Sequence, residues 1–413
     1  MFKSCSAYSF LILSILISGS CSVQNIKKNA GIIITPNQFK GSDIQRIQSA
    51  VNAAKGTTNQ VVIPSGNYNG TNIWLIDSAI LIPDNMTVIL DNATIQLSDS
   101  CRDNMFRSDN VGIGINDPVW NHNISIIGIG NVTLKGAANP RATGDSGKAL
   151  GKRSYGSDAG KAGRKQTGDW RNIMILMAYV DGFTLKNVNI ENSHAWAASF
   201  ERTINADISN IRFYNPGEID VNGKKVVTLN KDGIDLRHGC KNFRIDNISG
   251  LTSDDFIALS ILGLGSPNRE SGNLNSTMVT STKWRGPEDD TEQIFISNIT
   301  CQAYTRAVAI RANDSASIKN VYIDGIIWNG RYNAILAGGK GYGKPALPGN
   351  INNIHAMNIM GNGVSLIQIE EAIADCTFLN GIYTGGGDQI IIYNIEKEKL
   401  NNVISKNLIS ISK

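Results

Sequence analysis

Residues 185–190 read LKNVNI, an Asn flanked by the apolar residues of a short β-strand. The same pattern returns along the chain as ISNIRF (208–213), FRIDNI (243–248), IFISNI (294–299), IKNVYI (318–323) and INNIHA (351–356). Two of the intervals between these Asn residues are 23 and 22 residues long, and the longer ones hold inserted loops. Repeats of this kind are typical of a solenoid, in which each repeat forms one coil.

The repeated strands predict an all-β fold, a right-handed parallel β-helix. The alternative is a β-sandwich of hairpins, but turns such as Asn-Gly between paired strands are scarce. One amphipathic helix is expected before the strands, with Ser42 as its N-cap and apolar residues at helical spacing up to Ala54, ending near Gly56. We expect this short N-terminal helix to cap the solenoid.

The first residues read as an export signal: Lys3, an apolar run at 10–17, and small residues before Cys21. The run ends in a sequence that resembles the lipobox of bacterial lipoproteins. We therefore predict a lipoprotein-type signal peptide at 1–21 with Cys21 as a lipid anchor, and plain cleavage is the alternative. Residues 22–413 then form a single β-helix catalytic domain, exported to the periplasm or attached to the outer membrane.

The composition of the chain limits which classes of partner and metal are expected. Hydrophobic residues make up 41% of the chain and the net charge is only +4, which indicates a folded protein and argues against nucleic acid as a partner. No two of the four histidines lie at metal-ligand spacing, so zinc or iron is not expected. The widely spaced cysteines match no metal pattern and are expected to be buried packing residues: Cys101, Cys240, Cys301 and Cys376. The oligomeric state does not follow from the sequence.

Three segments lie outside the repeat: residues 137–170, 261–292 and 338–349. The first is rich in Gly, Lys and Arg. A basic flap beside a groove would attract an anionic substrate, and a solvated loop is the alternative.

A pair of residues precedes each strand at one place in the coil. The pairs are Ala195-Trp196, Lys231-Asp232, Asp254-Asp255, Thr305-Arg306 and Arg331-Tyr332. Stacked coils would place neighbouring members about 4.8 Å apart, so one ladder reads Trp196, Asp232, Asp255, Arg306 and Tyr332.

This ladder predicts acid–base chemistry on an acidic sugar. Crowded carboxylates repel, so one should keep its proton while another stays ionised; Asp232, Asp254 and Asp255 are the candidate catalytic residues. Arg306 could bind a carboxylate or sulfate with two hydrogen bonds, and its alternative role is to neutralise Asp255. Further candidate substrate-binding residues are Trp196, for ring stacking or for packing, and Tyr332, His238 and Lys231.

These residues resemble glycoside hydrolase family 28, the polygalacturonases, within the pectin-lyase-like superfamily of parallel β-helix proteins. Residues 192–196 (NSHAW) look like that family's Asn-Ser-Pro-x-Trp segment, 230–233 (NKDG) like its Asn-Thr-Asp-Gly motif, and 253–255 (SDD) like its Asp-Asp motif. The resemblance spans roughly residues 40 to 400. It implies a β-helix hydrolase that cleaves a uronate- or rhamnose-containing polysaccharide such as pectin.

Two family motifs are missing. The family's Gly-His-Gly falls on 305–307 (TRA), and its Arg-Ile-Lys falls on 333–336 (NAIL). The chain also resembles the β-helix dehydratases of marine bacteria that degrade ulvan oligosaccharides. That resemblance implies elimination of water from a non-reducing-end uronate, with Tyr332, His238 or Lys231 as the base.

The function therefore stays divided among several hypotheses. Arg306 beside the acids, with both family motifs lost, favours elimination, whereas the three retained Asp residues favour hydrolysis. A third hypothesis is a noncatalytic β-helix that only binds glycan. No cofactor or metal is expected, although clustered carboxylates leave a calcium-dependent lyase open.

Overall fold

A computed structural model describes residues 33–101, 103–115, 117–138, 170–228, 230–261, 278–280, 284–339, 344–387 and 389–411. The predicted signal peptide with Cys21 and most of the predicted basic flap lie outside these residues, and the other two insertions are described only in part. Residues from Ile33 onward form one compact unit. Among the described residues, no helix is both long enough and apolar enough to cross a membrane.

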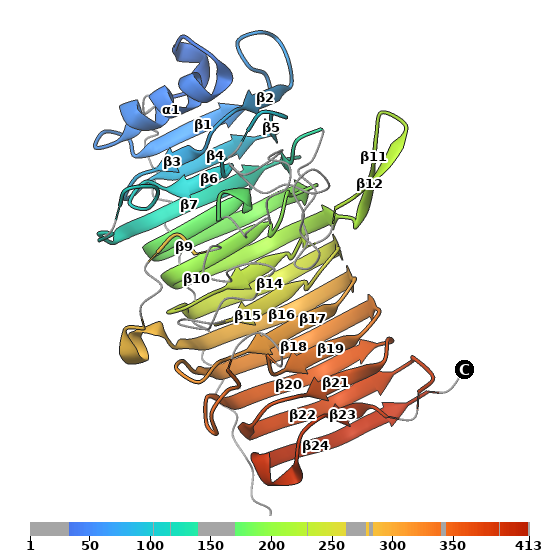
Figure 1. The fold of residues 1–413 in the computed structure, drawn as a ribbon. Helices are drawn as coiled ribbons and strands as arrows, with labels where there is room; N and C mark the ends of the chain where they lie inside the picture. The colour runs from blue at the N-terminus through green and yellow to red at the C-terminus, as the bar shows by residue number, and fades with distance from the viewer. Residues whose placement is uncertain are drawn as a thin grey trace, which may run out of the picture. The chain divides into compact units, whose positions relative to one another are not determined.

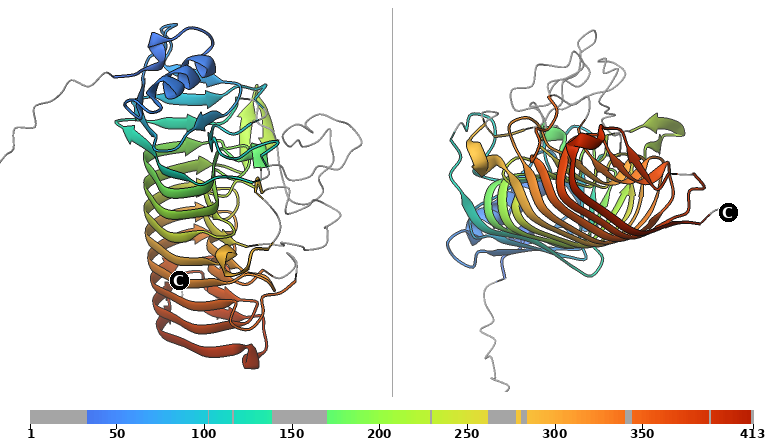
Figure 2. Two further views of the ribbon diagram at one scale, coloured as in Figure 1. Left: turned by 90° about the vertical axis from the view of Figure 1, so that its left-hand side faces the viewer. Right: turned by 90° about the horizontal axis from the view of Figure 1, so that it is seen from below.

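The strands of this unit form a large parallel sheet that coils around a core (Figure 1), and the coils stack one on another in Figure 2. The fold is the predicted right-handed parallel β-helix. The first row of paired strands consists of β1 (Gln60–Pro64), β4 (Thr87–Asp91), β7 (Asn121–Ile129), β9 (Ile175–Glu191), β10 (Ala198–Asn215), β14 (Lys241–Thr252), β16 (Thr291–Ala303), β18 (Ile318–Gly330), β20 (Ile351–Gly361), β22 (Ile373–Tyr383) and β24 (Leu400–Ser410).

Two further rows complete the coils. The second row lies near the N-terminus and contains β2 (Ile73–Ile76), β5 (Thr94–Leu97) and β8 (Thr133–Lys135). The third row contains β3 (Ile80–Ile82), β6 (Phe106–Ser108), the first residues of β9 and β10, and then β13 (Ile234–Leu236), β15 (Ile257–Ser260), β17 (Arg306–Arg311), β19 (Asn333–Ala337), β21 (Ser365–Ile369) and β23 (Ile391–Tyr393).

Outside these rows, an antiparallel hairpin of β11 (Glu218–Val221) and β12 (Lys224–Val227) projects from the coils (Figure 1). Short 3-10 helices occur at Pro36–Gln38, Trp170–Asn172, Gly286–Asp289 and Lys397–Lys399.

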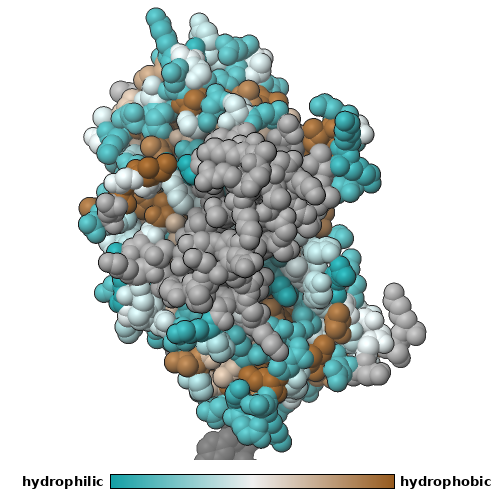
Figure 3. Space-filling model, viewed as in Figure 1, coloured by the Kyte–Doolittle hydropathy of each residue, from teal (hydrophilic) through white to brown (hydrophobic). Residues whose placement is uncertain are grey.

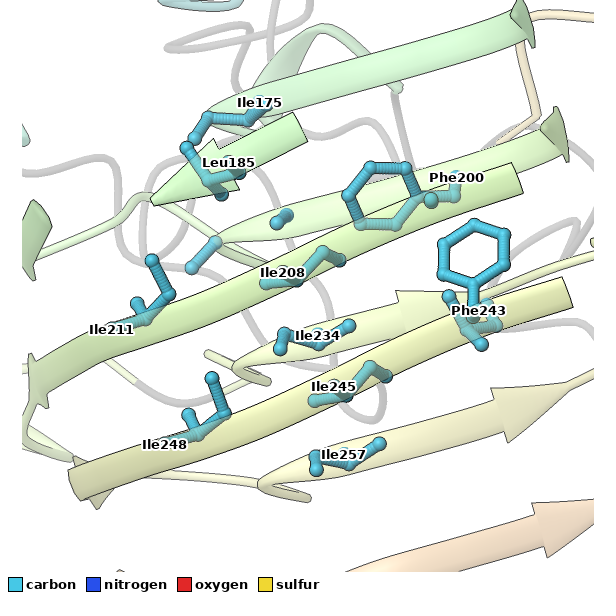
Figure 4. Packing of buried hydrophobic residues seen from close by; sticks show 14 of the residues in the cluster. Ile175, Leu185, Phe200, Ile208, Ile211, Ile234, Phe243, Ile245, Ile248 and Ile257 are labelled. Carbon is cyan, nitrogen blue, oxygen red and sulfur yellow. The ribbon is translucent and has the colours of Figure 1, made fainter. Parts of the chain in front are cut away.

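Aligned apolar side chains fill the inside of the coils (Figure 4). Ile208 pairs in register with Ile245, and the Phe200 and Phe243 rings meet edge to face with centroids 5.4 Å apart. Burying one such side chain contributes roughly 1.5–3 kcal/mol, so the same gain repeats coil after coil. The predicted packing role of Cys101, Cys240, Cys301 and Cys376 is confirmed, because all four are buried free thiols. The described face in Figure 3 is mostly hydrophilic.

The helix α1 (Asp43–Ala54) covers the first coil, as predicted. Ser42 and Gln45 form a capping box at its N-terminus. Ile47 and Val51 on its inner face are fully buried. The helix therefore closes an apolar end that stacked strands would otherwise expose.

The repeated Asn residues mark one bend of each coil. Asn187, Asn210 and Asn247 have φ of 59°, 57° and 55°, a left-handed conformation that Asn tolerates better than most residues. Their side chains also form a ladder: Asn210 Nδ2 donates to Asn187 Oδ1 at 2.9 Å, and Asn247 Nδ2 donates to Asn210 Oδ1 at 2.7 Å. The repeated Asn therefore has two structural causes: the positive φ at the bend and the hydrogen bonds between Asn side chains of neighbouring coils.

Asn210→Ala is expected to lower the free energy of unfolding by about 2 kcal/mol, because it combines left-handed strain with loss of the ladder bonds. Asn210→Gly should cost less, since glycine accepts the positive φ. Urea unfolding followed by circular dichroism measures both. An alanine variant as stable as the wild type would contradict this account of the Asn repeat.

Candidate functional site

The predicted ladder lies where each first-row strand bends into the third row. The backbone pairs its members directly: Ala197 N–H donates to Asp232 O at 2.9 Å, Gly233 N–H to Asp255 O at 3.0 Å, and Phe256 N–H to Arg306 O at 2.9 Å. The predicted register from Trp196 through Asp232 and Asp255 to Arg306 is therefore confirmed.

The prediction for the next coil is wrong by one residue, because Arg306 pairs with Asn333 rather than with Tyr332. The core sets this register. Val308 pairs with Ile335, and both side chains are fully buried in the interior. A slip of one residue would turn Ile335 outward. Tyr332 nevertheless stays beside the ladder, with its ring centroid 5.6 Å from the Arg306 guanidinium carbon.

The three predicted acids meet in space. One carboxylate oxygen from each of Asp232, Asp254 and Asp255 lies within 4.8 Å of the others. Asp254 is half-buried, whereas Asp232 and Asp255 are 6% and 2% exposed. Asp254 is thus the member of the cluster that solvent reaches most readily.

Asp255 is held as an anion by its neighbours. Its Oδ2 lies 2.6 Å from Arg311 Nη2, its Oδ1 lies 3.4 Å from Arg306 Nη1, and Thr305 Oγ1 donates to Oδ1. Burial alone would raise the pKa of Asp255, but the two guanidiniums and the Thr305 hydrogen bond outweigh it and hold the pKa below its ordinary value.

A fourth acid, Asp235, was missed by the sequence analysis. It lies in β13, in register between Ser199 and Ala258. Burial, together with repulsion from Asp255 and Asp254, raises its pKa well above the ordinary value, although Arg237 and Arg311 oppose the rise. The site therefore combines a carboxyl group whose pKa is raised with one whose pKa is lowered.

The strands contained a signal for these missed residues. Asp235 interrupts the apolar strand GIDL, and Arg311 ends the apolar strand AVAIR. Both alternate with inward-facing residues, Leu236 and Ile310, and so lie on the outer face of the third row. A charged residue at such a position in a short apolar strand indicates a site on that face.

The other predicted binding residues are less accessible. The Arg237 guanidinium carbon lies 5.0 Å from the Trp196 ring centroid, so a protein side chain already occupies one approach to the predicted stacking surface. His238 and Lys231 are fully buried. Burial, with Arg237 and Arg202 nearby, places the pKa of His238 well below its ordinary value, which favours a neutral ring.

Lys231 is costly to bury. Its Nζ lies 3.5 Å from Pro216 O, and burial lowers its pKa to about 7. Below pH 7 the lysine is protonated in the folded and the unfolded chain, and the folded state bears the full penalty. Between pH 7 and about 10.5 the unfolded chain binds the extra proton, so stability should rise with pH.

Lys231→Met is expected to stabilise the protein at or below pH 7 by on the order of a few kcal/mol. The gain should shrink as the pH approaches about 10.5. Chemical denaturation across this range measures it. Lys225→Met is the matched control, because Lys225 Nζ lies in an exposed ion pair with Glu218, and it should change stability little. A destabilised Lys231→Met protein would show that the ammonium group has a favourable partner.

Comparison with known proteins shows which solved structures share the fold of this chain. No family model matches the sequence, and no curated protein matches it. Among solved structures, an exopolygalacturonase from Thermotoga maritima is 13% identical, with a TM-score of 0.56 over 92% of this chain and 93% of that one.

Two other solved structures are similar to the same extent. A double mutant of the tailspike protein of E. coli bacteriophage HK620, in complex with a pentasaccharide, is 11% identical, with a TM-score of 0.57 over 92% of this chain and 67% of that one. A polygalacturonase from Erwinia carotovora is 14% identical, with a TM-score of 0.52 over 91% and 97%. These likenesses show that the chain has the right-handed parallel β-helix fold that the polygalacturonases also have.

Proposed function

We propose that this protein is an enzyme that acts on uronate-containing acidic oligosaccharides, and that it eliminates water from a uronate at the non-reducing end. The observation that carries the proposal is the ladder, in which Arg306 stacks directly on Asp255 and beside two further carboxylates. A guanidinium among acids binds the substrate carboxylate while the acids transfer protons. The sugar-binding and polygalacturonase neighbours support a carbohydrate substrate.

Elimination assigns a separate task to each group. Arg306 binds the uronate carboxylate and stabilises the negative charge that develops when the C5 proton leaves. A base removes that proton, the C4–O bond breaks, and the C4=C5 double bond forms. The departing hydroxyl takes a proton from a carboxyl of the acidic cluster and leaves as water. Of the three predicted bases, only Tyr332 is partly exposed and beside Arg306, so it is the proposed base.

Hydrolysis is the second candidate, and a different observation favours it. A glycoside hydrolase needs one protonated carboxyl and one ionised carboxylate, and the pKa values of Asp235 and Asp255 are shifted in the opposite directions that such a pair requires. In that case the site would cleave the chain of a uronate- or rhamnose-containing polysaccharide. Arg306 would then serve only to bind an acidic group or to neutralise Asp255.

One assay separates the candidates. Uronate-terminated oligosaccharides, including sulfated rhamnose–uronate and galacturonate series, are incubated with the full chain while ultraviolet absorbance and reducing ends are followed together. Unsaturation without chain shortening supports elimination, and shortening without unsaturation supports hydrolysis. If neither product forms, the remaining hypothesis is a noncatalytic glycan-binding protein. A parallel sample with a chelator tests whether the activity depends on calcium. Activity should persist in the chelator, because guanidiniums already neutralise Asp255.

A further inference from the structure

A pocket of about 350 Å³ lies at the ends of first-row strands, and its lining residue Ser253 directly precedes Asp254 of the acidic cluster. Its floor is formed where β14, β16 and β18 end, and Thr252, Ala303 and Gly330 pair there in register. Continuing each of these strands by two or three residues reaches Asp254 and Asp255, Thr305 and Arg306, and Tyr332. The pocket is therefore lined by residues of the same three coils that carry the proposed reaction centre.

Among the described residues that line the pocket, the exposed polar groups include one cation and no acid. Ser253 and Thr252 are buried, and their hydroxyls donate to backbone oxygens of Thr228 and Asp254. The groups that remain exposed at the rim are Gln302, Tyr304, Asn329 and Arg331. A pocket with this lining attracts an anion or a polar group rather than a cation.

Arg331 is held in place without being neutralised. Its Nη1 donates to the Tyr304 hydroxyl oxygen at 2.6 Å, and its guanidinium carbon lies 5.6 Å from the Tyr304 ring and 5.3 Å from the Tyr332 ring. Within the described part of the chain, Arg331 forms no ion pair, unlike Arg306 with its partner Asp255. Because the Tyr304 oxygen accepts from Arg331, its own proton is available to another acceptor. The two side chains together therefore present converging donors.

We propose that this pocket is a subsite for a second acidic group, a carboxylate or sulfate on the sugar next to the one that reacts, and that Arg331 and Tyr304 bind it. This inference rests on the proposed function for the orientation of the substrate. The Tyr332 ring is near both guanidiniums: its centroid lies 5.6 Å from the guanidinium carbon of Arg306 and 5.3 Å from that of Arg331. Arg306 would then bind the acid of the reacting sugar, and Arg331 the acid of its neighbour.

The test compares substrates that differ only at the second sugar, which carries a carboxylate, a sulfate or neither. KM and kcat are taken from initial rates, and Kd is taken from calorimetry for any probe that is not turned over. Arg331→Ala should raise KM or Kd for the doubly acidic probes about tenfold or more, with kcat nearly unchanged. The probe with a neutral second sugar should be unaffected, and the carboxylate and sulfate arms identify which oxyanion is preferred.

Further variants sharpen the comparison. Arg331→Lys should fall between wild type and alanine, because an ammonium group binds as a point charge. Tyr304→Phe should weaken binding severalfold through loss of one donor. Arg244→Ala is the matched control, because Arg244 is exposed and pairs with Asp246 elsewhere on the coils, and it should change neither constant.

Three results would overturn the subsite: no loss of affinity in Arg331→Ala, equal loss for acidic and neutral probes, or a fall in kcat alone. Absence of binding of every acidic probe to the wild type would overturn it as well. Failure of the proposed function looks different. In that case no probe is turned over, while the calorimetric preference for a second acid still depends on Arg331.

Discussion

Asp255→Asn is expected to lower turnover of uronate-terminated oligosaccharides about a thousandfold, within the range that acid–base residues contribute. Asp255 is the charged centre of the cluster, with Arg311 2.6 Å away and Arg306 3.4 Å away. An amide neither accepts a proton nor balances two guanidiniums. The same loss is expected under elimination and under hydrolysis, so this variant tests the location of the site rather than the reaction.

The variant should also be less stable. Asp255 and Arg311 side chains are 3% and 5% exposed, and removing one partner of a buried pair costs about 3–5 kcal/mol. The folded-state pKa of Asp255 is lowered, so its contribution is present above pH about 3.9 and is lost as the pH falls through the folded-state pKa. The stability difference between wild type and variant should therefore shrink in acid.

Asp324→Asn is the control for loss of one negative charge, because Asp324 is exposed on the outer face and accepts a hydrogen bond from Asn358. Its turnover should match wild type. Assays well below the melting temperature of Asp255→Asn, with circular dichroism on the same samples, separate lost chemistry from lost folding. A folded Asp255→Asn protein with a tenth or more of wild-type turnover would place the chemistry elsewhere.

Most of the fold could be predicted because the determinants of a β-helix are local. Each coil needs an Asn that tolerates positive φ and apolar residues at alternate positions, and both are visible in segments such as 185–190 and 208–213. The capping helix was equally readable, since Ser42 and the spacing of its apolar residues define its start and its buried face. The contacts of Asp232 and Asp255 followed from stacking the coils.

The parts of the site that could not be predicted depend on side chains that reach between coils. The predicted pairing of Arg306 with Tyr332 was wrong because the sequence NAIL (333–336) can be aligned with the preceding coil in two registers. Only the burial of Ile335 shows which register the strand adopts. Asp235 was read as part of a strand because no sequence rule shows which outer-face position lies within reach of Asp255. The role of Arg331 depends on its hydrogen bond to Tyr304, which is 27 residues away.

Arg306→Ala should slow elimination from a free uronate on the order of a hundredfold to a thousandfold, the scale of removing one donor from a developing oxyanion. The guanidinium is proposed to bind the substrate carboxylate and stabilise charge as the C5 proton leaves. Its side chain is 21% exposed and lies on the next coil after Asp255, so it can contact both protein and substrate. Arg306→Lys should retain part of the rate, because an ammonium group supplies charge without two parallel donors.

The reaction type follows from the response of Arg306→Ala to a methyl-esterified substrate. The ester has no negative carboxylate to neutralise, so under elimination the variant should lose much less rate on the ester than on the free acid. If Arg306 acts only by keeping Asp255 ionised, the loss should be equal on both substrates, because Asp255 is perturbed equally in each case. Ultraviolet absorbance of the unsaturated product gives the ratio of wild-type to variant rate on each substrate. Equal ratios would show that Arg306 does not bind the substrate carboxylate and would favour the hydrolase.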